Sequence, residues 1–393
     1  MTRTPTETTP SAARPARLVD AISSRDRILG ALTVLVTVAA ALARSLGDVA
    51  AFIAAGAALA LLAAGVGRAV EALGDRVGPA ATGILQSALG NLPELLILVF
   101  ALRQGLIAVV QATIVGSILA NVALVLGVAF IAGGLRHGTQ QFSGVAARDL
   151  GLSLLLAVAA LSVPSLTAHL HTPAASHERV LSQIVSVVLI AAFGLSVLAA
   201  LRPRRGSGRA NADVPGGDGE DRKTEPSTND RHESADRATV QWPLWLAVVV
   251  LAVTGVLAAL VSDWFVQALK PAMDTLNISD AFAGLVIVAI AGNAVENFVG
   301  IQLALKNRSE HALQVVLQSP LQIAMVVAPV VLLLSPLLGA GSFTLVLPPL
   351  LLASLLISAL IAVFITFDGE STWYEGVVLV ALYGLLAASF WWG

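Results

Sequence analysis

Apolar runs long enough to cross a lipid bilayer follow one another along almost the whole of this sequence. A helix needs about 20 such residues to span the hydrocarbon core. Only 12% of the 393 residues are charged, against about 25% in soluble domains, so the charges are too few to cover a soluble surface. We predict eleven spans, near residues 28–44, 48–67, 79–102, 106–133, 148–165, 180–201, 241–262, 281–305, 310–336, 344–366 and 373–391.

The composition excludes several classes of protein. The chain has no cysteine, which removes disulfide frameworks, thiolate metal sites and cysteine catalysis. Its net charge of −2 gives no reason to expect a nucleic-acid partner. The apolar residues are mostly Ala, Leu and Val in continuous runs, whereas a membrane β-barrel needs alternating apolar residues. We therefore predict an all-α polytopic membrane protein, with the lipid bilayer as its surroundings.

One long polar segment divides the chain. Residues 202–239 are rich in Gly, Asp, Glu and Arg, which is typical of a solvated linker. We expect a disordered tail over 1–27, an extra first helix over 28–44, and two five-helix units over 48–201 and 241–391.

The Lys and Arg residues predict the orientation. They gather in the tail, the linker and the segments at 68–78, 134–147 and 306–310. Cytoplasmic loops carry such an excess, so we expect the N-terminus and the linker in the cytoplasm and the C-terminus outside. The Arg- and Ala-rich tail, with no organellar signal, favours a prokaryotic plasma membrane.

A short motif occurs once in each five-helix unit. Because five is odd, the two units must cross the membrane in opposite orientations. Inverted repeats of this kind are typical of secondary transporters, whose substrate lies near the bilayer midplane. The repeated residues, related by one offset of 202, are Gly90, Asn91, Glu94 and Ser117 in the first unit and Gly292, Asn293, Glu296 and Ser319 in the second.

Glu94 and Glu296 fall inside apolar runs that we expect to be helices, where Asn91 and Asn293, three residues before them, would share their helix faces. A carboxylate in a membrane is expensive unless it is protonated, paired or bound to a cation. The alternative is a structural carboxylic acid satisfied by a backbone group. The occurrence of one glutamate at the equivalent place in each unit favours a functional pair.

Oxygen-bearing side chains accompany the two glutamates. Gly90 and Gly292 beside them allow close helix approach and local unwinding that frees carbonyl oxygens. A site made of carboxylates and neutral oxygens suits a hard divalent ion such as Ca²⁺, which takes about 6–8 oxygen ligands. The expected shell is Asn91, Asn293, Ser117, Asn121, Ser319 and Gln322, and Gln111, Thr113, Gln314 and Gln318 are further polar residues of the following helices. For any single Ser or Thr, an interhelical hydrogen bond is the alternative.

Charge balance suggests how such a site could work. Two ionised glutamates neutralise one Ca²⁺, and the emptied pair would repel until protons relieved it. A site that holds either one Ca²⁺ or about two protons can act as an antiporter. We then expect Ca²⁺ and H⁺ as substrates, no cofactor and no enzymatic activity. The alternatives are an H⁺-coupled antiporter for Na⁺, K⁺ or Mn²⁺ and, outside that class, a channel or an intramembrane enzyme.

The chain resembles the cation/proton exchanger branch of the Ca²⁺/cation antiporter superfamily from about residue 28 onward, apart from the linker. The motifs that carry the resemblance are Gly90-Asn91-x-x-Glu94-Leu95, Gly116-Ser117-Ile118-Leu119-x-Asn121, Gly292-Asn293-Ala294-x-Glu296, Ser319-x-x-Gln322-Ile323 and Asp368-Gly369-x-Ser371-x-Trp373-x-Glu375-Gly376. The resemblance implies eleven spans, Ca²⁺/H⁺ exchange, and Glu94 and Glu296 as cation ligands and proton carriers.

Two features bear on how far the resemblance extends. Asn91 and Asn293 stand where Na⁺/Ca²⁺ exchangers place Ser or Thr, which favours H⁺ over Na⁺ as the coupling ion. Asn297 stands where many members carry His, and Gln318-Ser319-Pro320 replaces a common Gly-Ser-Ala. Both departures fall in the second unit. The sequence leaves a homo-oligomer open.

Overall fold

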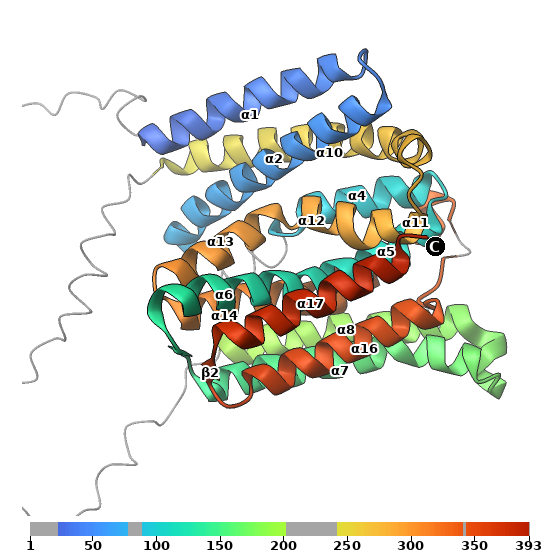
Figure 1. Cartoon of the computed structure of the whole chain (residues 1–393). Helices are drawn as coiled ribbons and strands as arrows, with labels where there is room; N and C mark the ends of the chain where they lie inside the picture. Colours follow the sequence, from blue (N-terminus) through green and yellow to red (C-terminus); the bar gives the residue numbers. More distant parts are fainter. Residues whose placement is uncertain (1–22, 78–88, 202–241, 341–342, 393) are drawn as a thin grey trace, which may run out of the picture.

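The computed structural model describes residues 23–77, 89–201, 242–340 and 343–392, and these form a bundle of helices with one short pair of strands (Figure 1). Before the linker the elements are α1 (Ser24–Ala43), α2 (Asp48–Val77), α4 (Leu92–Arg103), α5 (Ile107–Leu119), η2 (Ala120–Val125), α6 (Leu126–His137), β1 (Gln140–Gln141), α7 (Gly144–His169), η3 (Pro173–His177) and α8 (Glu178–Leu201). After it come α10 (Leu244–Leu276), α11 (Asp280–Phe282), η4 (Ala283–Val288), α12 (Ala289–Gly292), α13 (Ala294–Leu305), α14 (Ser309–Gln322), η5 (Ile323–Val327), α15 (Ala328–Leu334), η6 (Ser335–Leu338), α16 (Pro349–Thr366), β2 (Glu370–Ser371) and α17 (Trp373–Phe390).

The described residues contain nine helices that are long and apolar enough to cross a membrane. A tenth is present if the bent pair Asp280–Gly292 and Ala294–Leu305 counts as one span. The predicted third span, 79–102, lies only partly in the described residues, where α4 forms its second half. A multi-pass helical membrane fold is therefore confirmed, while the count of eleven stays a prediction.

Several helix ends differ from the predicted boundaries. α1 begins at Ser24 rather than 28, because the Ser23 side chain accepts from the Asp26 backbone N–H and caps the helix. α2 continues to Val77 and α10 to Leu276, past the ends of their apolar runs. Charged residues at the end of a span keep helical backbone once they reach water, so hydropathy marks the core of such a helix rather than its end. Most of the predicted tail and the whole linker, 202–239, lie outside the described residues.

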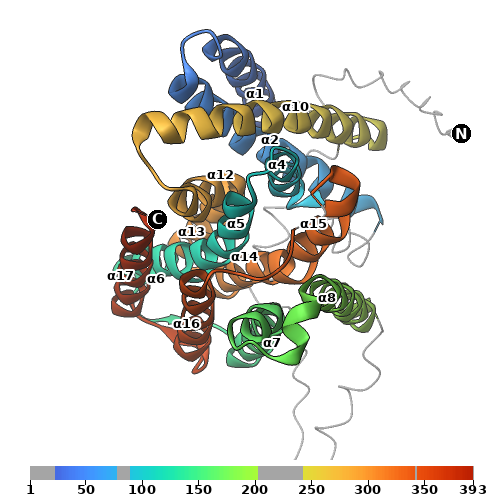
Figure 2. The ribbon, with the colours of Figure 1, turned by 90° about the vertical axis from the view of Figure 1, so that its right-hand side faces the viewer.

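The helices form three layers, seen most clearly in Figure 2. α1, α2 and α10 lie on one side, α7, α8 and α16 lie on the other, and α4, α5, α12 and α14 lie between them. Close helix crossings hold the middle layer together. A Cβ on Gly284 of η4 would lie 2.6 Å from the Val109 carbonyl oxygen, and a Cβ on Gly116 of α5 would overlap the backbone of Leu285. Small residues let two backbones approach where no hydrophobic drive exists between helices in lipid.

The two strands mark one end of the bundle, which we call the ladder end. Gln140 and Gln141 pair antiparallel with Ser371 and Glu370. The same loop reaches the last turn of α13, where Gln140 Nε2 donates to the Ala304 carbonyl at 3.3 Å and His137 Nε2 lies 2.9 Å from the Leu305 carbonyl oxygen. These contacts satisfy carbonyls that a helix C-terminus leaves free.

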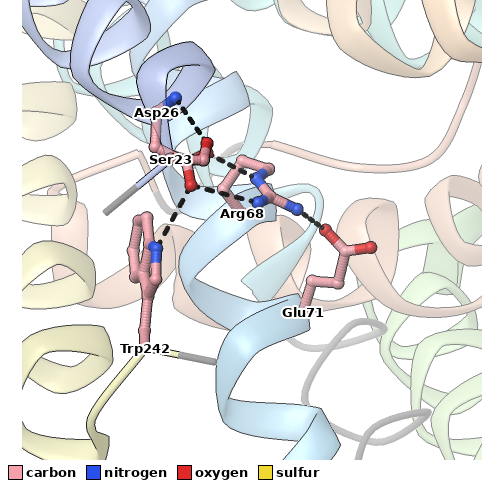
Figure 3. Close-up of polar contacts among 5 residues, drawn as sticks. All are labelled: Ser23, Asp26, Arg68, Glu71 and Trp242. Atoms are coloured by element: carbon pink, nitrogen blue, oxygen red, sulfur yellow. Dashed lines mark hydrogen bonds and ion pairs between the residues drawn. The ribbon is translucent and has the colours of Figure 1, made fainter. Parts of the chain in front are cut away.

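A polar junction ties the first helix to the rest at the ladder end (Figure 3). The side chain of Asp26 accepts from Arg68 Nε at 3.1 Å and from the Trp242 indole N–H at 3.2 Å. Arg68 also pairs with Glu71 at 2.5 Å. The first described residue after the linker therefore meets α1 and α2 at one carboxylate.

Candidate functional site

Both repeated motifs lie at the start of a helix. Asn91 (φ −92°, ψ 17°) precedes α4, and Asn293 (φ −106°, ψ 19°) separates α12 from α13, with a bend of 65° between those two helices. Glu94 and Glu296 occupy the third position of the new helix in each case. The interpretation that they lie well inside continuous helices, each sharing a face with its Asn, is wrong in this respect. They sit in first turns, where the helix dipole favours a negative charge.

Glu94 is the centre of the buried polar network. Its carboxylate is 1% exposed. Oε1 accepts a short hydrogen bond from the Ser117 hydroxyl and a second, at 3.3 Å, from the Asn293 amide. Gly292 leaves room for it, since a Cβ there would lie 3.5 Å from Glu94 Cβ. Oε2 is buried and has no hydrogen-bond partner in the part of the chain that the structure describes.

Asn293 joins the two motifs. Its amide nitrogen donates to Glu94 and also lies 3.1 Å from Ser117 Oγ and 3.0 Å from the Ala289 carbonyl oxygen. Its amide oxygen accepts from the Ser319 hydroxyl at 3.2 Å. Asn293, from the second motif, therefore orients the Glu94 carboxylate of the first. Ser117 and Ser319, each on the helix that follows its motif, contribute hydroxyls to this network.

A second cross-connection runs between Asn91 and Gln322. The Asn91 amide donates to Gln322 Oε1 at 2.9 Å, and both side chains are buried. Gly90 directly precedes Asn91 and is half-buried. This pair joins α4 to the end of α14 next to the Glu94 network, so Asn91 contacts an amide and not a carboxylate.

Glu296 lies close enough to Glu94 for their charges to interact. It is partly buried. The described residues give its side chain no hydrogen bond to another residue, in contrast to Glu94. The surroundings of the two glutamates therefore differ.

The other candidate residues divide into two groups. Asn121 lies in the π-helical segment η2, where its amide donates to the Ser117 carbonyl at 2.9 Å. Gln111 and Gln314 do not belong to the site. Gln111 donates to the carbonyls of Thr344 and Val346, and Gln314 donates to Glu310 in an exposed setting.

Some features of the site escape sequence reasoning. Helical periodicity does not reveal the π-helical segments η2 and η5, which follow Ser117 and Ser319 at matching places. Such segments occur often at functional sites. Pro93 is the one local signal of the first helix start, because proline is favoured in the first turn of a helix, where it is found here.

The donor set suits a hard cation. Among the described residues no three His, Cys, Asp or Glu side chains come together. The polar groups around Glu94 offer carboxylate, amide and hydroxyl oxygens, which are ligands that Ca²⁺ accepts.

A multi-pass helical bundle with one buried and one partly buried glutamate, each in the first turn of a helix, is the construction of a membrane transporter. Residues 47–202 and 246–392 match the sodium/calcium exchanger protein family, and the chain belongs to this family. It is 33% identical over 348 residues to the "Ca(2+)/H(+) antiporter" of Aphanothece halophytica, covering 87% of this chain and 90% of that one. It is 31% identical to the "Ca(2+)/H(+) antiporter ChaA" of Bacillus subtilis, covering 84% and 88%.

Solved structures resemble the fold closely. The structure of native YfkE superposes with a TM-score of 0.73 at 28% identity, over 93% of this chain and 98% of that one. The H⁺/Ca²⁺ exchanger CAX superposes with a TM-score of 0.69 over 93% and 92%. At 14% identity, this second likeness concerns the fold alone.

Proposed function

We propose that this protein exchanges Ca²⁺ for H⁺ across a membrane by alternating access, with Glu94 and Glu296 binding either one Ca²⁺ or protons. The observation that carries the proposal is the Glu94 carboxylate, which is buried, oriented through one oxygen by Ser117 and Asn293, and close to the charge of Glu296. Two relatives of this chain that it covers over most of their length are named Ca²⁺/H⁺ antiporters.

The residues give a reason for the coupling. Two carboxylates balance the charge of one Ca²⁺. Ser319, which is linked to Glu94 through Asn293, and the hydrogen-bonded pair Asn91 and Gln322 are the further oxygen ligands of the proposed shell. Without the cation, two neighbouring negative charges in a low-dielectric interior repel each other. Protons relieve this repulsion, so the same groups bind one substrate or the other. Because the two glutamates hold either Ca²⁺ or protons but not both, such a site exchanges the two ions and does not act as a channel.

We further propose eleven spans in which 48–201 and 241–391 are inverted repeats and α1 stands outside them. The two helices that begin at the motifs support this arrangement. α4 and α13 begin 202 residues apart, have cap residues of nearly equal φ and ψ, and run toward opposite ends of the bundle (Figure 1). η2 and η5 follow at corresponding places.

The same proposal includes the orientation. The ladder end, with the start of α1 and the residues around the linker, would face the cytoplasm of a prokaryotic cell, and the end of α17 would lie outside. Several basic residues lie toward the ladder end, in agreement with the excess of basic residues in cytoplasmic loops. They are Arg68, Arg136, Lys306 and Arg308.

The test is transport by the full-length chain in sealed vesicles. An imposed pH gradient should drive Ca²⁺ uptake, and uptake should release the gradient. Glu94→Gln and Glu296→Gln should each abolish exchange, because either change leaves one Ca²⁺ facing a single carboxylate. Glu178→Gln, at the start of α8 and away from the site, is the matched control. Full exchange in either site variant would refute the two-carboxylate mechanism, and competition by Na⁺, K⁺ or Mn²⁺ tests the alternative substrates.

A further inference from the structure

Two buried amide oxygens lie beside the carboxylate site and are not used by it. They are Oδ1 of Asn121, on η2, and Oδ1 of Asn297, on α13. Both atoms are inaccessible to solvent, and neither has a hydrogen-bond partner among the described residues. A buried amide oxygen without a partner costs about 1–3 kcal/mol, so two of them near one another call for an explanation.

The contacts on either side locate these two residues opposite each other. On the site side, Asn293 Nδ2 lies 3.1 Å from Ser117 Oγ. On the ladder side, a Cβ on Gly300 would lie 3.7 Å from Val125 Cγ1. Asn121 lies between Ser117 and Val125 on one helix, and Asn297 lies between Asn293 and Gly300 on the other.

The spacing along each helix is consistent with this placement. Asn121 follows Ser117 by four residues, as Asn297 follows Asn293, and residues four apart share a helix face. η2 and α13 are in contact. The two amides therefore form one layer between two layers of contacting residues, which we call the amide layer.

We propose that the amide layer, Asn121 and Asn297, is a second cation subsite, which takes a partly hydrated divalent cation on its way between the carboxylates and the ladder end. This inference rests on the proposed exchange function and assigns a role to Asn297. The chemistry agrees with it. Two neutral oxygens with no carboxylate bind a cation weakly, and a pathway needs steps that are weak enough for the ion to leave.

The distance between the layers separates this subsite from the main site. Four helical residues advance about 6 Å, whereas the oxygens around one Ca²⁺ lie about 2.3–2.6 Å from the ion. One ion therefore cannot contact the amide layer and the Ser117–Asn293 layer at once without a water between. The amide layer is a separate stop toward the ladder end and not the far side of the same shell.

Transport measured from each face tests the subsite. Asn297→Leu keeps the approximate size and removes the oxygen. We expect it to raise the KM for Ca²⁺ offered at the ladder end about tenfold, equivalent to about 1.4 kcal/mol, and to change the KM at the opposite face less than twofold. Asn297→Asp, which restores an oxygen, should return the first KM to the wild-type value or below. A tag on the C-terminus, which lies at the opposite end (Figure 1), reports vesicle orientation.

The controls separate a cation subsite from a structural role. Gln302→Leu removes an amide from the same helix, but roughly 140° around it from Asn297, and should leave both KM values unchanged. Thermal unfolding in detergent reports the fold, and Asn297→Ala, which also removes the oxygen, replaces the leucine variant should the latter not fold.

Each outcome decides between the possibilities. Equal KM changes at both faces, or none at either, would overturn the amide layer as a subsite while wild-type exchange stands. Absence of Ca²⁺ exchange in the wild-type chain would overturn the proposed function and this inference together.

Discussion

Asn293 and Asn91 occupy the same place in the two motifs, but the structure gives them different partners. Asn293 donates to the Glu94 carboxylate and accepts from Ser319. Asn91 donates to the neutral amide of Gln322. Replacing each by alanine therefore removes unequal interactions, and we predict unequal losses of Ca²⁺ affinity.

The magnitudes follow from the partners. A hydrogen bond to a charged group is worth about 1.5–3 kcal/mol and a neutral one about 0.5–1.5 kcal/mol. Asn293→Ala loses one of each, or about 2–4.5 kcal/mol. In the variant Glu94 is no longer held in place, and this ordering must be supplied when Ca²⁺ binds. The dissociation constant should rise about 30- to 2,000-fold, against about 2- to 12-fold for Asn91→Ala.

Calorimetric titration of Ca²⁺ into the purified full-length protein measures both values. Thermal unfolding of each variant without Ca²⁺ separates lost folding from lost binding. An affinity loss for Asn91→Ala equal to or larger than that for Asn293→Ala would contradict the assigned asymmetry. A loss below threefold for Asn293→Ala would show that this amide does not orient Glu94.

Three further predictions concern packing and linkage. Gly292→Ala should bind Ca²⁺ nearly as the wild type does in calorimetric titration, because its Cβ would make an ordinary 3.5 Å contact with Glu94. Gly116→Ala should lower the unfolding free energy, measured by denaturation in detergent, by about 1–3 kcal/mol, because its Cβ would overlap the backbone of Leu285. Asp26→Ala should destabilise the fold by about 1–2 kcal/mol, because it removes the acceptor at the α1 junction. Limited proteolysis measures the unfolding of α1, and unchanged protease resistance would argue against the junction. Ca²⁺ at about 100 times its dissociation constant should stabilise the wild type by about 2.7 kcal/mol, reversibly with a chelator, and an equal effect in Glu94→Gln would place the ion elsewhere.

The sequence was sufficient to predict the membrane fold, because about 20 apolar residues in a row have few other uses. It was less informative about where helices end. α10 continues through Asp263 and Lys270 to Leu276, where Lys270 pairs with Asp274 and Asp280. Hydropathy falls at these residues although the helix does not stop.

The motifs predicted the members of the site better than their arrangement. Burial and repetition identified Glu94 and Glu296, and the spacing identified Asn293 and Ser319. Local unwinding was expected at Gly90 and Gly292, but the start of a new helix at each motif was not, because the Asn before each glutamate was taken to share its helix face. Asn is among the favoured residues for helix caps, and with Pro93 it could have indicated a helix start. The link from Asn293 to Glu94 joins residues about 200 positions apart, and no local pattern encodes it.

The two motifs share a backbone arrangement, and their side chains break its symmetry. Among the described residues, Glu94 has one oxygen fixed by donors from both motifs and one oxygen without a partner, whereas the Glu296 side chain has no hydrogen bond to another residue. A carboxylate that is already oriented loses little freedom on binding a cation, but one without such bonds must be ordered at that moment. Glu94 is therefore suited to fix the position of the ion, and Glu296 to join it later. The amide layer begins one residue after Glu296, so the less constrained carboxylate lies next to the proposed route to the ladder end. An ion that enters or leaves by this route needs a ligand that can move with it, and Glu296 is the freer of the two.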